Sequence, residues 1–413
     1  MQVQSNLFVN KLFRNYYNNE ESCKGMALLM IEEREFGFIS FDNIMIRHKT
    51  FANQNALWEF LKDFVPSDAY YSCAYYADPT AEMDRKGWIG ADLIFDIDAD
   101  HIPTSCDKVH DKWTCVACGF AGKGSVPSRC PICGKEKFVV NTWPCNLCLE
   151  SAREETAKVL DMLVLDFGFS EKDIRVFFSG HRGYHVHVES ELIHKLDAIA
   201  RKEIVDYFTG LGLDMQFPVL AEKYQGRQSS PYVFQLGDFG WQKRLALELQ
   251  SFIRNAKEKD FNEIGLKKTV SYAILKNKEM ILKDWSETKA LTSVKGVGVE
   301  TWRKILNYVA KLKSAKIDTV VTADIHRLIR LPDTLHGKTG FKKVEFPLSR
   351  IDSFDPFKDA IAFREGEATV NVSDAPEFRV GDEVFGPYKN QKVELPTAAA
   401  LLLVCKGRAE VVR

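Results

Sequence analysis

The sequence predicts an α+β protein, with mixed sheets flanked by helices, that carries a metal-binding insertion and a helical insertion. Helical spacing and strand alternation both occur in residues 1–100 and 151–200, and strand patterns return in 316–413. Cysteine, glycine and proline are dense in 101–150, where long apolar side chains are few. Residues 201–315 are mostly helical and rich in Lys and Glu. We therefore expect five segments with these boundaries.

Composition places the chain among ordinary folded proteins. Of its 413 residues 45% are hydrophobic and 12% aromatic, which is enough for a substantial core. The net charge of −1 means that any contact with nucleic acid must come from local basic patches. The N-terminus lacks a signal-peptide pattern, and the longest apolar run, 398–405, is far shorter than the roughly 18–20 residues of a membrane span. We expect a soluble cytoplasmic protein that does not enter a membrane.

Periodicity predicts the individual elements. Residues 55–64 have helical spacing, and 151–169 form a second predicted helix with Ser151 as N-cap and Glu154 completing a capping box. Alternation of apolar and polar side chains predicts strands over 37–41, 92–98, 173–178 and 184–188. Strand character is also expected from 318–324 to the C-terminal end, including the last hydrophobic stretch.

The stretch DLIFDIDADH, residues 92–101, places four aspartates among the apolar residues of a predicted strand. Because side chains alternate along a strand, Asp96 and Asp98 lie on the same face, about 6–7 Å apart. Two carboxylates this close repel each other unless a cation lies between them or one is protonated. Hard divalent ions such as Mg²⁺ or Mn²⁺ are the usual partners. A strand end that enters a polar loop is the alternative.

A second chemical cluster lies in FFSGHRGYHVHV, residues 177–188, which reads as two strands joined by a glycine-bearing turn. The turn and one strand face bring together Ser179, His181, Arg182 and His185. A hydroxyl, imidazoles and a guanidinium are groups that bind phosphate oxygens. A polar hairpin with solvent-facing histidines is the alternative.

A third cluster, in residues 318–340, contains basic side chains at Arg327, Arg330, His336 and Lys338. Its GKT triplet is not a P-loop, because the glycine that this motif requires is replaced by Pro332.

Seven of the ten cysteines fall between Cys106 and Cys148, a density that indicates metal binding in a cytosolic protein. Two CxxC pairs on glycine-rich knuckles have zinc-ribbon spacing and predict a closed Zn²⁺ site made of Cys115, Cys118, Cys130 and Cys133. An iron–sulfur cluster or a metal-free thiol cluster is the alternative. The remaining pair, Cys145 and Cys148, has Cys106 and His110 upstream.

Residues 291–313 are similar to a helix–hairpin–helix motif, which grips nucleic-acid phosphates through backbone amides, with Lys295, Arg303 and Lys304 adding charge. A plain helical turn is the favoured interpretation. Arg47 and Lys49 could also contact a nucleic-acid template.

Taken together, four sequence words in this order resemble the catalytic small subunit of archaeal and eukaryotic DNA primases. They are REFGF (34–38), KGWIGADLIFDIDAD (86–100), SGHRGYHVHV (179–188) and RLIRLPDTLHGKTG (327–340), and the C-terminal ELPTAAALLLVCKGRAEVV also resembles archaeal members. The resemblance covers essentially the whole chain. It implies a primase catalytic domain formed by 1–100, 151–200 and 316–413, interrupted by the two insertions.

The resemblance also assigns site residues. Asp96 and Asp98 would bind the catalytic Mg²⁺ or Mn²⁺ with Asp318 as third carboxylate, and Asp324 is the second choice for that role. The triphosphate of the incoming nucleotide would be held by Ser179, His181, Arg182, His185, Arg330, His336, Arg327 and Lys338. Other members carry Arg where this chain has His181.

Family members commonly have a zinc site that ends in a CxxC pair before a long helix, so the resemblance implies a second zinc site from Cys106, His110, Cys145 and Cys148. Asp107 or His101 could replace His110 as the fourth ligand. Both zinc sites would be structural. The remaining cysteines, Cys23, Cys73 and Cys405, are expected to be buried small residues.

The implied function is a DNA primase that makes short RNA, or DNA, primers de novo on single-stranded DNA from NTPs or dNTPs, as a heterodimer with a large subunit. A repair polymerase of the same superfamily, which extends existing ends, is one rival. A non-catalytic zinc-ribbon protein that binds nucleic acid is the other.

Overall fold

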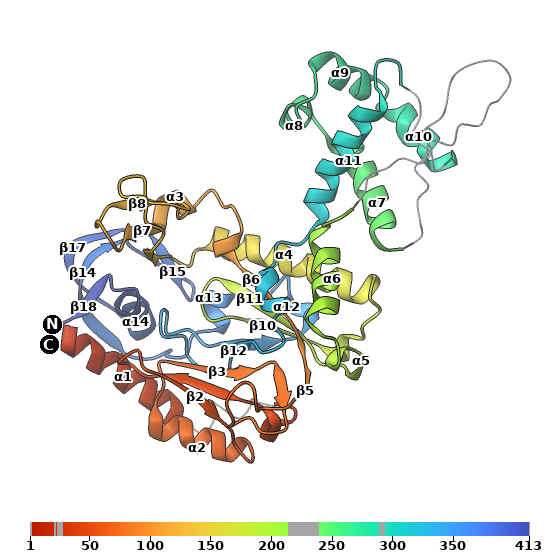
Figure 1. Cartoon of the computed structure of the whole chain (residues 1–413). Helices are drawn as coiled ribbons and strands as arrows, with labels where there is room; N and C mark the ends of the chain where they lie inside the picture. Colours follow the sequence, from red (N-terminus) through yellow and green to blue (C-terminus); the bar gives the residue numbers. More distant parts are fainter. Residues whose placement is uncertain (1, 20–21, 23–27, 214–238, 289–293, 413) are drawn as a thin grey trace. The chain divides into compact units, whose positions relative to one another are not determined.

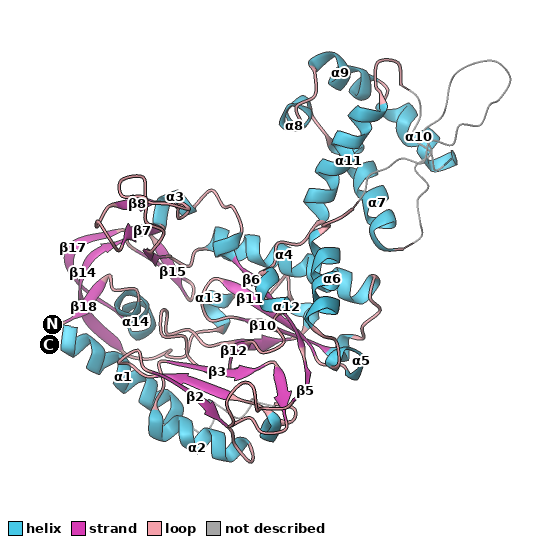
Figure 2. Cartoon of the chain, in the orientation of Figure 1, coloured by secondary structure: helices cyan, strands magenta, loops and turns pink. Residues whose placement is uncertain are grey.

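The computed structural model describes residues 2–19, 22, 28–213, 239–288 and 294–412 (Figure 1). They belong to two compact units. The first is Met1–Ala157, Ser170–Val205 and Lys316–Arg413, and the second is Lys158–Phe169 and Asp206–Ala315. Helices and strands are mixed in the first unit, which is an α+β arrangement as predicted (Figure 2). Every regular element described in the second unit is a helix.

Two four-stranded antiparallel sheets form the body of the first unit. One has the order β12-β3-β1-β2, with bounds Leu328–Arg330, Asp68–Ser72, Phe36–Ile39 and Met45–Lys49. The other has the order β13-β10-β11-β6, with bounds Val344–Phe346, Ile174–Phe178, Gly183–Val188 and Leu93–Asp98. Each sheet therefore joins strands that are remote in the sequence, and this pairing is what assembles the candidate site.

Helices α1 (Gln2–Asn18) and α2 (Gln54–Phe64) pack against the first sheet (Figure 1). Helix α2 begins after Asn53, whose side chain accepts a hydrogen bond from the Ala56 amide at 3.0 Å, and it buries Leu57 and Leu61. Phe13 and Phe38 are fully buried in the same core. Burial of each such side chain contributes about 1.5–3 kcal/mol to the free energy of folding. This packing stabilises the position of the sheet next to the site.

A third sheet has the order β17-β14-β18 (Tyr388–Pro396, Glu367–Ala375, Ala409–Val411), and helix α14 (Thr397–Cys405), which connects β17 to β18, packs against it. The strand predicted for the last hydrophobic stretch is wrong, because this stretch is α14. Alanine and leucine favour a helix, and a helix that is apolar all round is stable when buried. The side chains from Thr397 to Leu403 are indeed all buried.

The remaining elements are short or lie in the insertions. The cysteine-rich segment forms the sheet β8-β7-β9 (Ala121–Lys123, Lys112–Cys115, Phe138–Asn141) beside α3 (Asp107–His110). Two hairpins are β4–β5 (Ala74–Tyr76, Trp88–Ala91) and β15–β16 (Phe378–Val380, Glu383–Phe385). Other first-unit helices are α5 (Glu191–His194), α12 (Thr319–Ala323) and α13 (Pro356–Asp359), with single turns η2 (Ile31–Glu33), η3 (Ala99–His101), η4 (Glu171–Asp173) and η5 (Leu348–Arg350).

Two longer helices, α4 (Asn146–Leu165) and α6 (Ala198–Thr209), contribute residues to both units. The second unit adds α7 (Gly240–Asn255), α8 (Glu258–Glu263), α9 (Lys268–Lys276), α10 (Lys278–Thr288) and α11 (Val299–Lys313).

The predicted helix over 55–64 and the strands over 92–98, 173–178 and 184–188 are confirmed to within about a residue at each end. The strand over 37–41 is shorter, because a turn begins at Ser40.

Two element predictions are wrong at functionally relevant places. Helix α4 begins at Asn146 and not after Ser151, because the buried Cys148, Leu149 and Ala152 extend its apolar face towards the N-terminus. Residues 319–323 form helix α12 and not a strand. Its N-cap is Asp318, whose carboxylate accepts hydrogen bonds from the amides of Val320 and Val321.

Candidate active site and metal centres

The paired carboxylates lie at the edge strand β6 of the second sheet. Asp96 and Asp98 share one face of the strand, and both are half-buried. Pairing with β11 sets Asp96 opposite His185 and Asp98 opposite Gly183, and the His185 Nε2 atom lies 3.5 Å from Asp96 Oδ1. A side chain at Gly183 would collide with the carbonyl oxygen of Ile97, so this position admits only glycine while the strands stay paired.

These carboxylates resist ionisation. Burial, followed by the charges of Asp98 and Asp318, raises the pKa of Asp96 to about 7. Burial also raises the pKa of Asp98. Carboxylates that are held together in this way are the donor set that a hard divalent cation requires.

Asp318 joins this group through the backbone as well as through charge. Its amide donates to the Asp96 carbonyl oxygen at 2.8 Å, and its Oδ2 atom lies 3.8 Å from His101 Nε2. Asp324, at the other end of α12, instead accepts a hydrogen bond from the His326 amide at 2.9 Å.

The turn between β10 and β11 is closed by the Ser179 amide, which donates to the Gly183 carbonyl oxygen at 2.9 Å. Gly180 takes a positive φ of 87°, and a side chain there would press on the His336 Cβ. The His181 and His336 rings lie 5.1 Å apart between centroids. The hairpin and the segment that follows β12 therefore meet at this turn.

Arg182, predicted to contact the triphosphate, is already bound by carboxylates. It donates to both Asp111 oxygens at 3.0 and 2.8 Å and to the Trp143 carbonyl oxygen at 3.3 Å, and it pairs with Asp100. Burial lowers the pKa of Arg182 to about 10. In this structure Arg182 links the hairpin to the cysteine-rich insertion.

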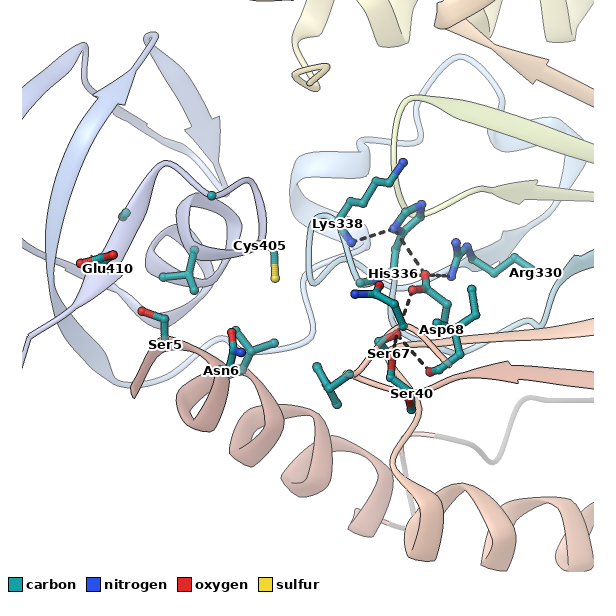
Figure 3. Close-up of a pocket in the computed structure, with 18 of the residues that line it drawn as sticks. Ser5, Asn6, Ser40, Ser67, Asp68, Arg330, His336, Lys338, Cys405 and Glu410 are labelled. Carbon is teal, nitrogen blue, oxygen red and sulfur yellow. Dashed lines mark hydrogen bonds and ion pairs between the residues drawn. The ribbon is translucent and has the colours of Figure 1, made fainter. Parts of the chain in front are cut away.

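The end of β12 and the segment after it supply the other basic groups (Figure 3). Arg330 donates to Asp68 Oδ1 at 2.7 Å, and the same oxygen accepts the Gly337 amide at 3.1 Å. The Lys338 amide donates to His336 Nδ1 at 3.1 Å, while the Lys338 side chain is exposed. These residues line a cavity of about 730 Å³ whose opposite wall comes from α1 and from residues 404–410.

The imidazoles near the carboxylates are neutral. Burial, with neighbouring cations, lowers the pKa values of His181, His185 and His336 well below the ordinary range. The buried Nδ1 atom of His185 has no hydrogen-bond partner in the described part of the chain. Arg327 adds a positive charge that acts on both Asp96 and His185. The surroundings of Asp96 therefore offer an imidazole and a cation that can bind an anionic ligand.

The four cysteines predicted to form a zinc ribbon come together in the first cysteine cluster. Ligand atoms of Cys115, Cys118, Cys130 and Cys133 all lie within 4.8 Å of one another. Each knuckle is closed by a glycine amide: Gly119 donates to the Cys115 carbonyl oxygen and Gly134 to that of Cys130, both at 2.9 Å. Both glycines have positive φ, which leaves the thiols pointing to a common centre.

The second cluster brings together Cys106, His110, Cys145 and Cys148, also within 4.8 Å of one another. His110 is buried, its Nε2 atom lies 3.3 Å from Cys145 Sγ, and its Nδ1 atom lies 2.7 Å from Asp111. A carboxylate on the second imidazole nitrogen is the usual arrangement around a histidine that binds a metal. The alternatives are engaged elsewhere, because Asp107 accepts a hydrogen bond from Ser125 and His101 faces Asp318.

Comparison with known proteins identifies the family to which the chain belongs. A family model described as DNA primase small subunit matches residues 141–348. The DNA primase small subunit of Methanothrix thermoacetophila is 32% identical over 100% of both chains. Those of Nitrosopumilus maritimus and Archaeoglobus fulgidus are 30% and 31% identical, respectively, over 98% of both chains. The chain belongs to the DNA primase small-subunit family. The resemblance drawn from the sequence words is thereby confirmed, and membership implies a nucleotidyltransferase-type enzyme.

Three residues of this primase small subunit were not predicted and shape its site. Asp68 orients Arg330, Asp111 joins His110 to Arg182, and Lys406 contacts His181. Asp68 and Asp111 lie outside the quoted motifs, and Lys406 lies in the C-terminal stretch ELPTAAALLLVCKGRAEVV, to which no site role was assigned. Only the tertiary contacts show that these three residues belong to the site. Asp92, the first aspartate of the stretch DLIFDIDADH, is fully buried against Arg34 and Tyr75.

The predicted DNA-backbone elements of the primase small subunit are partly described. Residues 291–293 lie outside the described residues, and Gly298 precedes α11, in which Trp302 and Ile305 are buried and Arg303 pairs with Glu300. Arg47 donates a hydrogen bond to the buried Glu35 at 2.9 Å. The charge of Arg47 is therefore largely balanced by a carboxylate of the protein itself. In the described ranges, no helix is both long and apolar enough to cross a bilayer.

Proposed function

We propose that this chain is the catalytic subunit of a DNA primase, which carries out template-directed nucleotidyl transfer and makes short primers de novo on single-stranded DNA. The observation that carries the proposal is that Asp318, remote in sequence, lies beside the strand edge that carries Asp96 and Asp98, near buried imidazoles and cations. Family membership supports it.

In this proposal Asp96, Asp98 and Asp318 hold the catalytic ions. When bound, Mg²⁺ or Mn²⁺ would activate the attacking 3′-hydroxyl and neutralise the leaving pyrophosphate. The raised pKa of Asp96 fits this role, because a carboxylate with no cation in place is costly to ionise next to two others. Asp318 is favoured over Asp324, since its charge acts on Asp96 and its amide is bonded to β6.

The triphosphate would lie against the turn of the hairpin and the segment after β12. Ser179, His181 and His185 offer a hydroxyl and imidazoles, and they would be joined by Arg330, His336, Arg327 and Lys338. These groups would orient the triphosphate and offset the charge that develops as pyrophosphate leaves. Arg182 would act mainly by holding the turn, because its guanidinium is bound by Asp100 and Asp111.

Two zinc ions would support the fold. Four thiolates in one cluster, and three thiolates with His110 in the other, are donor sets that suit closed tetrahedral sites. We expect metal analysis to give about two equivalents of zinc per chain. A value near one would contradict the second site.

The chain would act as a heterodimer with a large subunit and would use single-stranded DNA as template and NTPs or dNTPs as substrates. The catalytic domain would comprise residues 1–100, 151–200 and 316–413, with the zinc-binding insertion at 101–150 and the helical insertion at 201–315.

Primer-free synthesis on a single-stranded template tests this function. The chain, with its large subunit, should make short products from nucleotides and Mg²⁺ or Mn²⁺ without any annealed primer. Asp96→Ala and Asp98→Ala should each reduce synthesis by at least roughly 100-fold, the scale of losing one charged group at a reacting centre, while DNA binding persists. The exposed Asp84→Ala is the matched control and should retain activity.

The rivals give other outcomes. Products that appear only with an annealed primer would indicate a repair polymerase. If Asp96→Ala and Asp98→Ala leave the function of the chain unchanged, it is a non-catalytic nucleic-acid-binding protein.

A further inference from the structure

Lys406 is a buried lysine whose ammonium group contacts the turn of the hairpin. It is only 6% exposed, and its Nζ atom lies 2.6 Å from His181 Nε2. The Thr142 hydroxyl lies 3.5 Å from the same nitrogen. Since the His181 ring lies 5.1 Å from the His336 ring, Lys406 belongs to the same group of basic side chains although it is remote from them in the sequence.

The backbone of Lys406 is fixed on both sides. Its amide donates to the Leu402 carbonyl oxygen at 3.0 Å and ends helix α14, and its own carbonyl oxygen accepts from Asn141 Nδ2 at 3.3 Å. Any residue could make these two backbone bonds. The lysine side chain is therefore not needed for capping, and its ammonium group is directed to His181.

The cations around Lys406 outweigh Asp111, the carboxylate whose charge acts on it. Among the described residues no carboxylate lies within ion-pair distance of it, whereas Arg330 has Asp68 and Arg182 has Asp100 and Asp111. Burial, followed by Arg182 and Lys338, lowers the pKa of Lys406 to about 7. A buried ammonium among other cations costs folding energy, and a bound anion would offset that cost.

The shape of the group indicates which anion fits. The charge of Lys406 acts on His181 and His336 and also on Asp98, so it influences both the basic turn and the carboxylates. Its chain neighbours Cys405 and Gly407 line the same cavity as Lys338 and Arg330 (Figure 3). An anion that contacts all these groups must carry several negative charges along an extended chain, as a polyphosphate does.

We propose that Lys406 is a further nucleotide-binding residue, which contacts the triphosphate of the incoming nucleotide beside His181. The inference rests on the proposed function and adds to it a residue outside the matched range 141–348. Beside the neutral imidazole of His181, Lys406 from the C-terminal segment would provide the positive charge at this position.

Equilibrium binding without template or primer tests the role of Lys406. ATP, AMP and inorganic tripolyphosphate are titrated into the full chain with Mg²⁺. Lys406→Met keeps the volume of the side chain and removes its charge, so we expect Kd for ATP and tripolyphosphate to rise roughly tenfold, as for one lost charge-assisted hydrogen bond. Kd for AMP should not change, and the exposed Lys392→Met should bind all three as wild type does.

Two further variants separate binding from folding. Lys406→Arg should recover most of the affinity, and His181→Arg in the Lys406→Met background should do the same by placing a permanent charge at the same turn. The unfolding midpoint of Lys406→Met should be equal to or higher than that of wild type, because an unpaired buried charge is removed.

The outcomes distinguish this inference from the proposed function. If wild type binds neither ATP nor tripolyphosphate, the nucleotide site itself is refuted. If wild type binds both and Lys406→Met binds them equally well, the function stands and the role of Lys406 is overturned. Equal loss of AMP affinity, or a lowered unfolding midpoint without recovery in Lys406→Arg, would also overturn it.

Discussion

Asp92 and Asp96 are neighbours on the same stretch of chain, yet their surroundings are opposite. Burial by itself acts to raise the pKa of both carboxyl groups. At Asp92 this is outweighed by Arg34 at 2.7 Å, His194 and the Tyr75 hydroxyl at 2.6 Å, so its pKa lies below the ordinary range. At Asp96 the charges with the largest effect are those of two other carboxylates, Asp98 and Asp318, and the pKa of Asp96 rises to about 7.

This difference separates a charge that stabilises the fold from one that awaits a ligand. A buried carboxylate that binds a guanidinium and a hydroxyl has its charge and its hydrogen bonds satisfied within the protein. The negative charge of a buried carboxylate beside two others is balanced only when a cation binds. The basic side repeats the contrast, since Arg330 has its own carboxylate and Lys406 has none among the described residues.

Removing the charge of Asp92 should have the largest effect on stability. Asp92→Asn leaves Arg34 buried without a counter-charge, and we expect the free energy of unfolding to fall by about 3–5 kcal/mol at pH 7. Urea denaturation measures it, with the exposed Asp84→Asn as a control that should change it by less than about 0.5 kcal/mol. A change at Asp92 as small as that of the control would remove the contrast with Asp96.

Removing the charge of Asp96 should act in the opposite direction and depend on pH. Because its folded pKa is raised, the folded state holds a proton that the unfolded state releases, and stability falls as pH rises towards about 7. Without added Mg²⁺ or Mn²⁺, the stability of Asp96→Asn relative to wild type should therefore grow by on the order of 2 kcal/mol between pH 5 and pH 8. Denaturation at the two pH values checks this, and a pH-independent difference would show that Asp96 ionises without penalty.

Added Mn²⁺ should give the smallest effect and sharpen the distinction between the two aspartates. At several times its Kd, the ion should stabilise wild type by about 1 kcal/mol at pH 8 and less at pH 6, where Asp96 is partly protonated. Asp96→Asn should lose this stabilisation, measured as a shift in Tm. An equal shift in both proteins would place the ion elsewhere.

Local patterns predicted much of this molecule. Strand alternation identified β6 and the face shared by Asp96 and Asp98, and CxxC spacing identified the ligands of the first cysteine cluster. The resemblance to primases added His110 to the second cluster, where the structure places it. Local periodicity was insufficient at α12 and α14, because apolar β-branched or aliphatic runs fit a short strand and a buried helix equally well.

The amino-acid order thus decided which chemical groups are available, since periodicity and ligand spacing act over a few residues. Which groups meet was decided by sheet pairing and helix packing between segments that are far apart in the sequence. The register of β6 with β11 sets His185 against Asp96, and the end of α14 brings Lys406 to His181. Asp92 and Asp96 look alike in DLIFDID, and only the packed surroundings give one an arginine and the other two carboxylates.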